Sequence, residues 1–245
     1  MKFLGMAVKI SLSLLEYESE LAKYSDQLAT SEAFSRTMEL VDSNRLYSLH
    51  IDVMRPPFIL DRSAFPTNLI RRIYQAFHDR IALEMHLMVR NSEFLFQEFN
   101  NFVDPKDRSN ILMAIQREAY GSEHEIITAL NTIRVMGYRN GIALDLPTPI
   151  GSLTGEMVEA ADVIQIMSVP MGKGGQKYDE RATEKIRYLA SRFPRKVVKV
   201  DGGINDKTAR HARKAGAEVL VVGSFITTSK SPLEALERLH RALTD

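Results

Sequence analysis

The chain is 245 residues long and 44% hydrophobic, which suffices to bury one large core. Its 32 basic residues nearly cancel its 31 acidic ones, so charge gives no reason to expect nucleic acid or an anionic membrane as a partner and favours a small molecule. The absence of cysteine excludes disulfides and thiolate ligands, so any transition metal would have to be bound by histidine and carboxylate side chains.

Short runs rich in β-branched residues alternate with stretches of helical periodicity, which is the pattern of parallel strands joined by crossover helices. We predict strands at Val8–Leu14, Tyr47–Met54, Ala82–Val89, Asn110–Gln116, Gly141–Leu146, Val163–Val169, Val197–Asp201 and Val219–Gly223. We predict helices at Pro66–Phe77, Ser92–Asn101, Glu123–Met136, Leu153–Ala160, Glu180–Arg192, Asp206–Ala215 and Pro232–Leu243. The segment Tyr17–Leu46 is long enough for two more. Asn205 is a typical residue for a helix start and Gly216 for a helix end.

Eight β/α pairs in a chain of this length predict a closed (β/α)8 TIM barrel of the α/β class, with residues 1–245 as a single domain. A doubly wound open sheet is the alternative. The start of the chain carries too few apolar residues for a secretion signal, and no apolar run is long enough to span a membrane. We therefore expect a cytoplasmic protein without a membrane partner.

Histidine and aspartate lie near the carboxyl ends of three predicted strands, where barrel enzymes place their functional side chains. His50 and Asp52 are two residues apart on the second strand and so point to the same face, while His86 lies on the third and Asp201 on the seventh. Two imidazoles and two carboxylates suit Zn(II), Fe(II), Mn(II) or Co(II), so we predict one divalent-metal site. The alternative is a set of rim polar groups that hydrogen-bond to one another. The other histidines lie on predicted helices and are expected to face solvent or make local contacts: His78, His124, His211 and His240.

Glycines cluster after three successive strands late in the chain. They are Gly172, Gly174 and Gly175 after the sixth strand, Gly202 and Gly203 after the seventh, and Gly223, followed by Ser224, after the eighth. Loops after the last two strands of a barrel commonly bind phosphate through backbone N–H groups. Since tight turns also need glycine, each group alone says little, but their joint position predicts a phosphate site.

At these residues the chain resembles the ribulose-phosphate 3-epimerase family. The matching segments are Lys9-Ile10-Ser11-Leu12-Ser13-Leu14, His50-Ile51-Asp52-Val53-Met54, Met85-His86-Leu87-Met88-Val89, Met167-Ser168-Val169, Gly172-Lys173-Gly174-Gly175-Gln176, Val200-Asp201-Gly202-Gly203-Ile204 and Val222-Gly223-Ser224. The resemblance runs from about Val8 to the C-terminus and implies a barrel of the ribulose-phosphate-binding type. It also implies a homo-oligomer, either a dimer or a hexamer.

The resemblance further implies roles for individual residues. In that family the counterparts of His50, Asp52, His86 and Asp201 bind one divalent metal, and the two aspartates act as acid and base on opposite faces of the substrate. It implies inversion of C3 of a ketose phosphate through an enediolate, in the first place ribulose 5-phosphate to xylulose 5-phosphate. The residues implied to contact substrate are Ser13 beside it, Met54, Met88 and Met167 around the reacting carbon, and the late glycines at the phosphate.

The chain departs from the family pattern at several positions. The usual Asp-Gly and Phe-Val-Pro-Asn after the second strand are replaced by Arg55-Pro56-Pro57-Phe58-Ile59-Leu60-Asp61. A His and a Glu after the fourth strand become Ala114 and Gln116, and the sixth loop reads Pro170-Met171-Gly172-Lys173. We hypothesise that Arg55 and Lys173 contact a different substrate group, as in a phosphorylated hexulose such as allulose 6-phosphate. The alternative is that both are solvated loop charges.

Lys199 replaces an acidic residue expected two positions before Asp201. It should point into the barrel, where an unpaired ammonium group is costly, so we predict a partner, either Glu84 or Gln165. Two other functions compete with an epimerase. A sugar-phosphate synthase or decarboxylase lacks support, because its closely spaced Asp and Lys set is absent from Leu49–Asp61. The other is a non-catalytic sugar-phosphate binding protein that lost catalysis through its altered loops, and the intact set of four predicted metal ligands argues against it.

Overall fold

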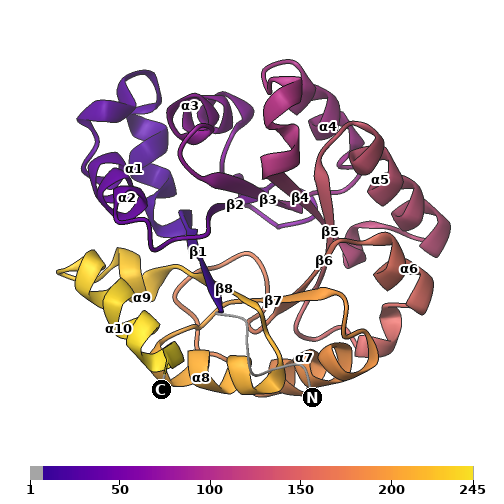
Figure 1. Cartoon of the computed structure of the whole chain (residues 1–245). Helices are drawn as coiled ribbons and strands as arrows, with labels where there is room; N and C mark the ends of the chain where they lie inside the picture. Colours follow the sequence, from indigo (N-terminus) through magenta and orange to yellow (C-terminus); the bar gives the residue numbers. More distant parts are fainter. Residues whose placement is uncertain (1–7, 245) are drawn as a thin grey trace.

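The computed structural model of the chain describes residues 8–244, in which eight parallel strands close into a barrel (Figure 1). The strands are β1 (Lys9–Ser13), β2 (Ser48–Met54), β3 (Ala82–Met88), β4 (Ile111–Gln116), β5 (Arg139–Leu144), β6 (Val163–Met167), β7 (Val197–Asp201) and β8 (Val219–Val222). Each strand pairs with the next in sequence, and β8 pairs with β1. The predicted α/β TIM barrel is confirmed, and the doubly wound open sheet is excluded. Residues 1–7 and 245 of the predicted single domain lie outside the described residues.

Helices surround the barrel (Figure 1). They are α1 (Glu18–Lys23), α2 (Glu32–Asp42), α3 (Thr67–Phe77), α4 (Glu93–Asn100), α5 (Glu123–Val135), α6 (Gly155–Ala160), α7 (Arg181–Arg192), α8 (Asp206–Ala215), α9 (Ser224–Thr227) and α10 (Pro232–Thr244). In α3 the buried residues Leu69, Ile70, Ile73, Tyr74 and Phe77 recur at helical spacing, so one face packs on the sheet. Within residues 8–244, no helix is long and apolar enough to cross a membrane.

The residues typical of helix ends predicted the bounds of α8 correctly. The Asn205 side chain accepts hydrogen bonds from the backbone N–H groups of Lys207 and Thr208, and Gly216 ends the helix with a φ of 110°. The predicted bounds of β5, Gly141–Leu146, were wrong. The strand spans Arg139–Leu144, and the chain leaves the sheet after Leu144. There Asp145 Oδ1 accepts hydrogen bonds from the N–H groups of Leu146 and Met171, which replace strand pairing.

Other boundaries shifted for similar reasons. The predicted helix Leu153–Ala160 begins at Gly155, since the Thr154 hydroxyl caps it by accepting from the N–H of Met157. Between β1 and β2 the chain forms α1 and α2, as predicted, together with 3₁₀ turns at Leu15–Tyr17 and Ser25–Thr30. The four-residue helix α9 after Gly223 was not predicted.

Strand register places the polar side chains inside the barrel. Asp52 of β2 lies opposite His86 of β3, and Met167 of β6 lies opposite Asp201 of β7. Side chains alternate along each strand, so Ile51 and its apolar neighbours Leu49 and Val53 face the helices and are fully buried there. The main hydrophobic core therefore lies between the barrel and its helices, and the barrel interior holds the polar side chains of the candidate site.

Candidate metal centre and active site

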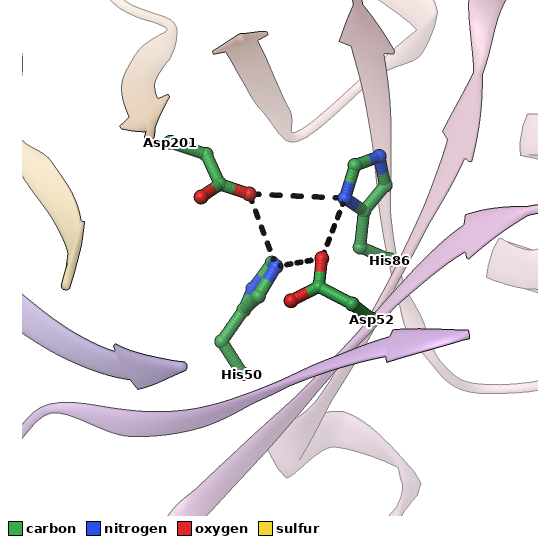
Figure 2. A group of neighbouring side chains, drawn as sticks. All are labelled: His50, Asp52, His86 and Asp201. Atoms are coloured by element: carbon green, nitrogen blue, oxygen red, sulfur yellow. Dashed lines mark hydrogen bonds and ion pairs between the residues drawn. The ribbon is translucent and has the colours of Figure 1, made fainter. Parts of the chain in front are cut away.

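Four side chains from three strands converge inside the barrel (Figure 2). They are the predicted ligands His50, Asp52, His86 and Asp201, all buried. His50 Nε2 lies 3.3 Å from both Asp52 Oδ1 and Asp201 Oδ2. His86 Nδ1 lies 3.2 Å and 3.8 Å from the same two oxygens. Ligands about 2.0–2.2 Å from a tetrahedral metal are about 3.3–3.6 Å apart, so this cluster fits one divalent ion.

His86 is held with one nitrogen toward the cluster. Its Nε2 lies 2.7 Å from Gln116 Oε1, an acceptor, and its Nδ1 accepts from Gln165 Nε2 at 3.1 Å. The amide nitrogen of Gln116 donates to Glu118 Oε2 at 2.5 Å, which fixes the orientation of the amide. The Nε2–H tautomer therefore leaves the Nδ1 lone pair facing Asp52 and Asp201, as a metal ligand requires. Gln116, a departure from the family pattern, thus orients a predicted ligand.

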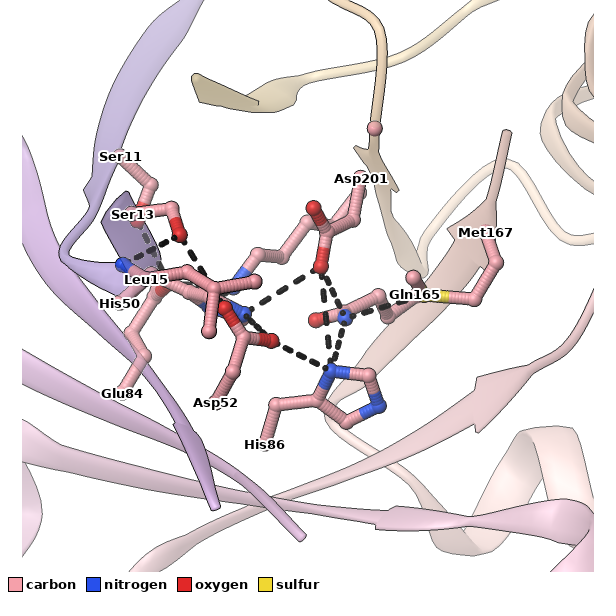
Figure 3. Close-up of polar contacts among 12 residues, drawn as sticks. Ser11, Ser13, Leu15, His50, Asp52, Glu84, His86, Gln165, Met167 and Asp201 are labelled. Atoms are coloured by element: carbon pink, nitrogen blue, oxygen red, sulfur yellow. Dashed lines mark hydrogen bonds and ion pairs between the residues drawn. The ribbon is translucent and has the colours of Figure 1, made fainter. Parts of the chain in front are cut away.

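The Nδ1 side of the His50 ring faces two buried charged side chains, Glu84 (Figure 3) and Lys199. Its Nδ1 lies 3.3 Å from Glu84 Oε2 and 3.0 Å from Lys199 Nζ. Glu84 Oε2 also accepts from Ser11 Oγ at 2.6 Å and forms a short ion pair with Lys199. The predicted partner of Lys199 is confirmed as Glu84. With Nδ1 turned toward Glu84 and Lys199, the other ring nitrogen of His50, Nε2, faces the cluster, where it could bind a metal.

The electrostatics keep the acidic groups ionised. Burial opposes ionisation of Asp52, but contacts with His50 and His86 outweigh it and hold the pKa of Asp52 well below its usual range. Burial likewise opposes ionisation of Glu84, but Lys199 and then His50 keep its pKa low. Burial and Lys199 lower the pKa of His50, yet Asp52 and Asp201 raise it more, so it lies well above the usual value. Such a cluster attracts a cation, whether proton or metal.

A cavity borders the cluster, since Asp52 and Asp201 both line it. Its lining also includes the residues that the family resemblance implied to contact substrate: Ser13, Met54, Met88, Met167, Gly172, Gly174, Gly175, Gly202, Gly203, Gly223 and Ser224. The Ser13 hydroxyl donates to Asp52 Oδ2 at 3.1 Å. The structure brings these residues together, while their contacts with a substrate stay predictions.

Two of these glycines have a packing reason of their own. Gly202 has a φ of 113°, and a Cβ there would lie 2.5 Å from a methyl group of Val169. Gly203 has a φ of 60°, and its Cβ would clash with the main chain of Tyr178. Glycine at these positions is therefore required by the fold, whatever binds in the cavity.

The two loop charges behind the hexulose hypothesis differ in position. The Arg55 guanidinium donates to the carbonyl oxygens of Met54, Ala64 and Phe65 at 2.7, 2.5 and 2.8 Å, which ties the loop after β2 together. Arg55 is not part of the cavity lining, so the structure gives no support to its hypothesised contact with substrate. Lys173 does line the cavity.

The remaining histidines make local contacts or face solvent, as expected. His78 Nδ1 lies 3.0 Å from Asp107, His211 Nδ1 lies 3.4 Å from Glu180, and His240 Nε2 lies 2.9 Å from the carbonyl oxygen of Arg45. His124 is exposed. Sequence reasoning missed the places of Ser11, whose hydroxyl lies 2.5 Å from that of Ser48, and of Glu16, which lines the cavity. Serine and glutamate are common residues whose contacts cannot be inferred until their neighbours are known.

Metal binding should stabilise the protein measurably. With free Mn(II) or Zn(II) at 100 times its dissociation constant, we expect the free energy of unfolding to rise by about 2.7 kcal/mol, because the folded state binds the ion. Thermal unfolding with and without the metal would measure this. The substitution His86→Asn should remove most of the increment, whereas His211→Asn, on the outer surface, should keep it. An unchanged melting temperature of the parent protein would contradict the site.

Comparisons with known proteins agree with this arrangement. Residues 27–227 match the model of the Ribulose-phosphate 3 epimerase family. The chain is 29% identical over 222 residues to the ribulose-phosphate 3-epimerase of Helicobacter pylori, covering 89% of this chain and 96% of that protein. It is 30% identical over 200 residues to the ribulose-phosphate 3-epimerase of Schizosaccharomyces pombe, covering 80% and 81%.

Solved structures agree in fold. The 3-hexulose-6-phosphate synthase of Salmonella typhimurium matches with a TM-score of 0.67 and 17% identity over 96% of this chain and 98% of that one. The 3-keto-L-gulonate-6-phosphate decarboxylase of Vibrio cholerae matches with a TM-score of 0.68 and 9% identity over 98% of both. At these identities the likeness extends to the barrel alone.

Fold and site together define a (β/α)8-barrel enzyme with a candidate divalent-metal centre beside a cavity at the carboxyl ends of its strands. The chain belongs to the ribulose-phosphate 3-epimerase family, and it is accordingly an isomerase that acts on carbohydrates.

Proposed function

We propose that the protein interconverts ribulose 5-phosphate and xylulose 5-phosphate by inverting C3 through an enediolate. One observation carries the proposal: Asp52 and Asp201, on different strands, both belong to the metal cluster and both line the cavity. A C–H beside a ketone is only weakly acidic, so its removal and return from opposite faces need two positioned proton carriers. The named activity of the curated relatives supports this reaction.

Each aspartate has a separate place in the reaction. Asp52 turns Oδ1 toward both histidines and receives the Ser13 hydroxyl on Oδ2, which orients the carboxylate. Asp201 Oδ2 accepts from Gln165 Nε2 at 3.0 Å. One aspartate removes the C3 proton and the other returns a proton on the opposite face. A divalent ion held by the four ligands would stabilise the negative charge that develops on the ketone oxygen.

The walls of the cavity suit this chemistry. Met54, Met88 and Met167 line it and are buried, so the reacting carbon would sit among apolar groups that exclude water. The glycine loops after β6, β7 and β8 offer main-chain groups to the phosphate end of the sugar. The hexulose-phosphate alternative is not favoured, because Arg55 is engaged elsewhere and the relatives are named for ribulose phosphate.

The setting of the reaction belongs to the same proposal. We expect a cytoplasmic homo-oligomer, a dimer or a hexamer, and one relative in rice is named as the cytoplasmic isoform. The metal is one of Zn, Fe(II), Mn or Co, since imidazole and carboxylate ligands serve each of them.

Exchange of the C3 proton tests the activity directly. The metal-loaded protein is incubated in deuterated water with ribulose 5-phosphate and, in parallel, with allulose 6-phosphate, and C3 is followed by NMR. We expect deuterium to enter C3 with inversion, faster in the pentulose. A clear preference for the hexulose would overturn the proposed substrate. Bound metal without exchange in either sugar would overturn the proposed activity.

A further inference from the structure

A carboxylate side chain lies among the glycine loops of the cavity. Glu16 sits in the 3₁₀ turn Leu15–Tyr17 that follows β1, and it lines the cavity together with Gly174 and Gly223. A Cβ added to Gly223 would lie 2.8 Å from Glu16 Oε2, and one added to Gly174 would meet Oε1. The carboxylate of Glu16 therefore fills the space that these two glycines leave free.

Glu16 gains little from this position. Its Oε2 is buried and has no hydrogen-bond partner. Burial raises the pKa of Glu16, and the nearby negative charges of Asp52 and Asp201 raise it further, against the opposing effects of a backbone hydrogen bond and Arg62. By contrast, the buried Glu84 is paired with Lys199 and bonded to Ser11. An unpaired buried oxygen is costly, so the location of Glu16 calls for an explanation in function.

The same space is where the proposed function puts the phosphate of the substrate. A phosphate carries about 1.5–2 negative charges at neutral pH and needs donors around its oxygens. Glu16 offers an acceptor and a charge of the same sign, and like charges brought together cost binding free energy. A terminal hydroxyl of an unphosphorylated ketose, in contrast, can donate to the Glu16 carboxylate.

Resting on the proposed function, we propose that Glu16 determines specificity at the phosphate end of the site. Its carboxylate must leave the space between Gly174 and Gly223 before a phosphate can occupy it. Its charge weakens the binding of the sugar phosphate relative to a ketose that ends in a hydroxyl group. Glu16 thus sets the affinity for the substrate and takes no part in proton transfer at C3.

The variants Glu16→Gln and Glu16→Ser test this proposal. The first removes the charge and keeps the shape, and the second also removes the volume. We expect both to lower KM for ribulose 5-phosphate by about tenfold with little change in kcat, because the like-charge contact is lost. For unphosphorylated ribulose KM should stay the same or rise. The control Glu32→Gln, whose side chain is 69% exposed on α2, should behave as the parent protein.

Binding of inorganic phosphate to the metal-loaded protein supplies a readout that needs no turnover. Isothermal titration should show tighter binding by Glu16→Gln than by the parent protein. Equal or weaker phosphate binding, or an unchanged or higher KM for ribulose 5-phosphate, would overturn the role of Glu16. If the parent protein fails to exchange C3 of either sugar, the proposed function fails, while the titration still decides the role of Glu16.

Discussion

Replacing Asp201 by asparagine should slow deuterium incorporation at C3 of ribulose 5-phosphate by at least about 100-fold, the lower end of what one proton-transfer group contributes. The amide keeps the shape of the side chain and its place beside Gln165 but can no longer take up a proton. The rate of exchange is followed by NMR with the metal-loaded variant. Metal content, measured in the same samples, separates a loss of proton transfer from a loss of the ion.

A matched control for this variant is Asp26→Asn, since the side chain of Asp26 is 91% exposed, in the 3₁₀ turn Ser25–Thr30, and does not line the cavity. It makes the same chemical change and should leave the exchange rate unchanged. If Asp201→Asn retained the full exchange rate while the metal was bound, Asp201 would not carry the proton. The proposal that Asp52 and Asp201 act as acid and base on opposite faces would then be overturned.

Replacing Lys199 by methionine should lower the free energy of unfolding by about 3–5 kcal/mol, as expected when one partner of a buried ion pair is removed. Lys199 is fully buried inside the barrel, where its ammonium group contacts Glu84 and His50. Without it the Glu84 carboxylate would be left with a buried, uncompensated charge. Denaturant unfolding of the metal-free protein measures the loss without a contribution from the ion.

Two further variants sharpen this measurement. Adding Glu84→Gln to Lys199→Met should recover part of the loss, because no charge is then left unpaired. The substitution Lys207→Met on the exposed face of α8 should change stability by no more than about 0.5 kcal/mol. A Lys199→Met variant as stable as the parent protein would show that the ion pair does not support the barrel interior.

The metal cluster could be predicted from the sequence because side chains alternate between the two faces of a strand. Side chains two residues apart on a strand share a face, and barrel strands end at one rim, so His50 and Asp52 could be placed with His86 and Asp201. The same logic predicted that Lys199 points into the barrel and pairs with Glu84 or Gln165, and the structure shows that the partner is Glu84. The helix α8 was predicted to the residue, because Asn205 and Gly216 act on their immediate neighbours.

Contacts that depend on how loops and neighbouring strands come together could not be predicted from the sequence. Arg55 was expected at the substrate, but its guanidinium reaches carbonyl oxygens nine and ten residues further along a folded loop. Glu16 gave no signal at all, since its position between Gly174 and Gly223 joins segments more than 150 residues apart. Gln116 was noted only as a departure, and its bond to His86 depends on the pairing of β3 with β4.

By itself the amino-acid sequence predicted the strand and helix order, the closed barrel and the four candidate ligands, because these follow from local periodicity, caps and strand spacing. The family resemblance, not periodicity, supplied the methionines, the serines and the glycine loops that border the cavity. Only the tertiary structure decided which groups orient the ligands, that Arg55 serves its own loop, and that Glu16 occupies the space between the glycine loops. The physical reason is that hydrogen bonds and charge interactions act over a few ångströms, and only folding sets those distances between residues remote in sequence.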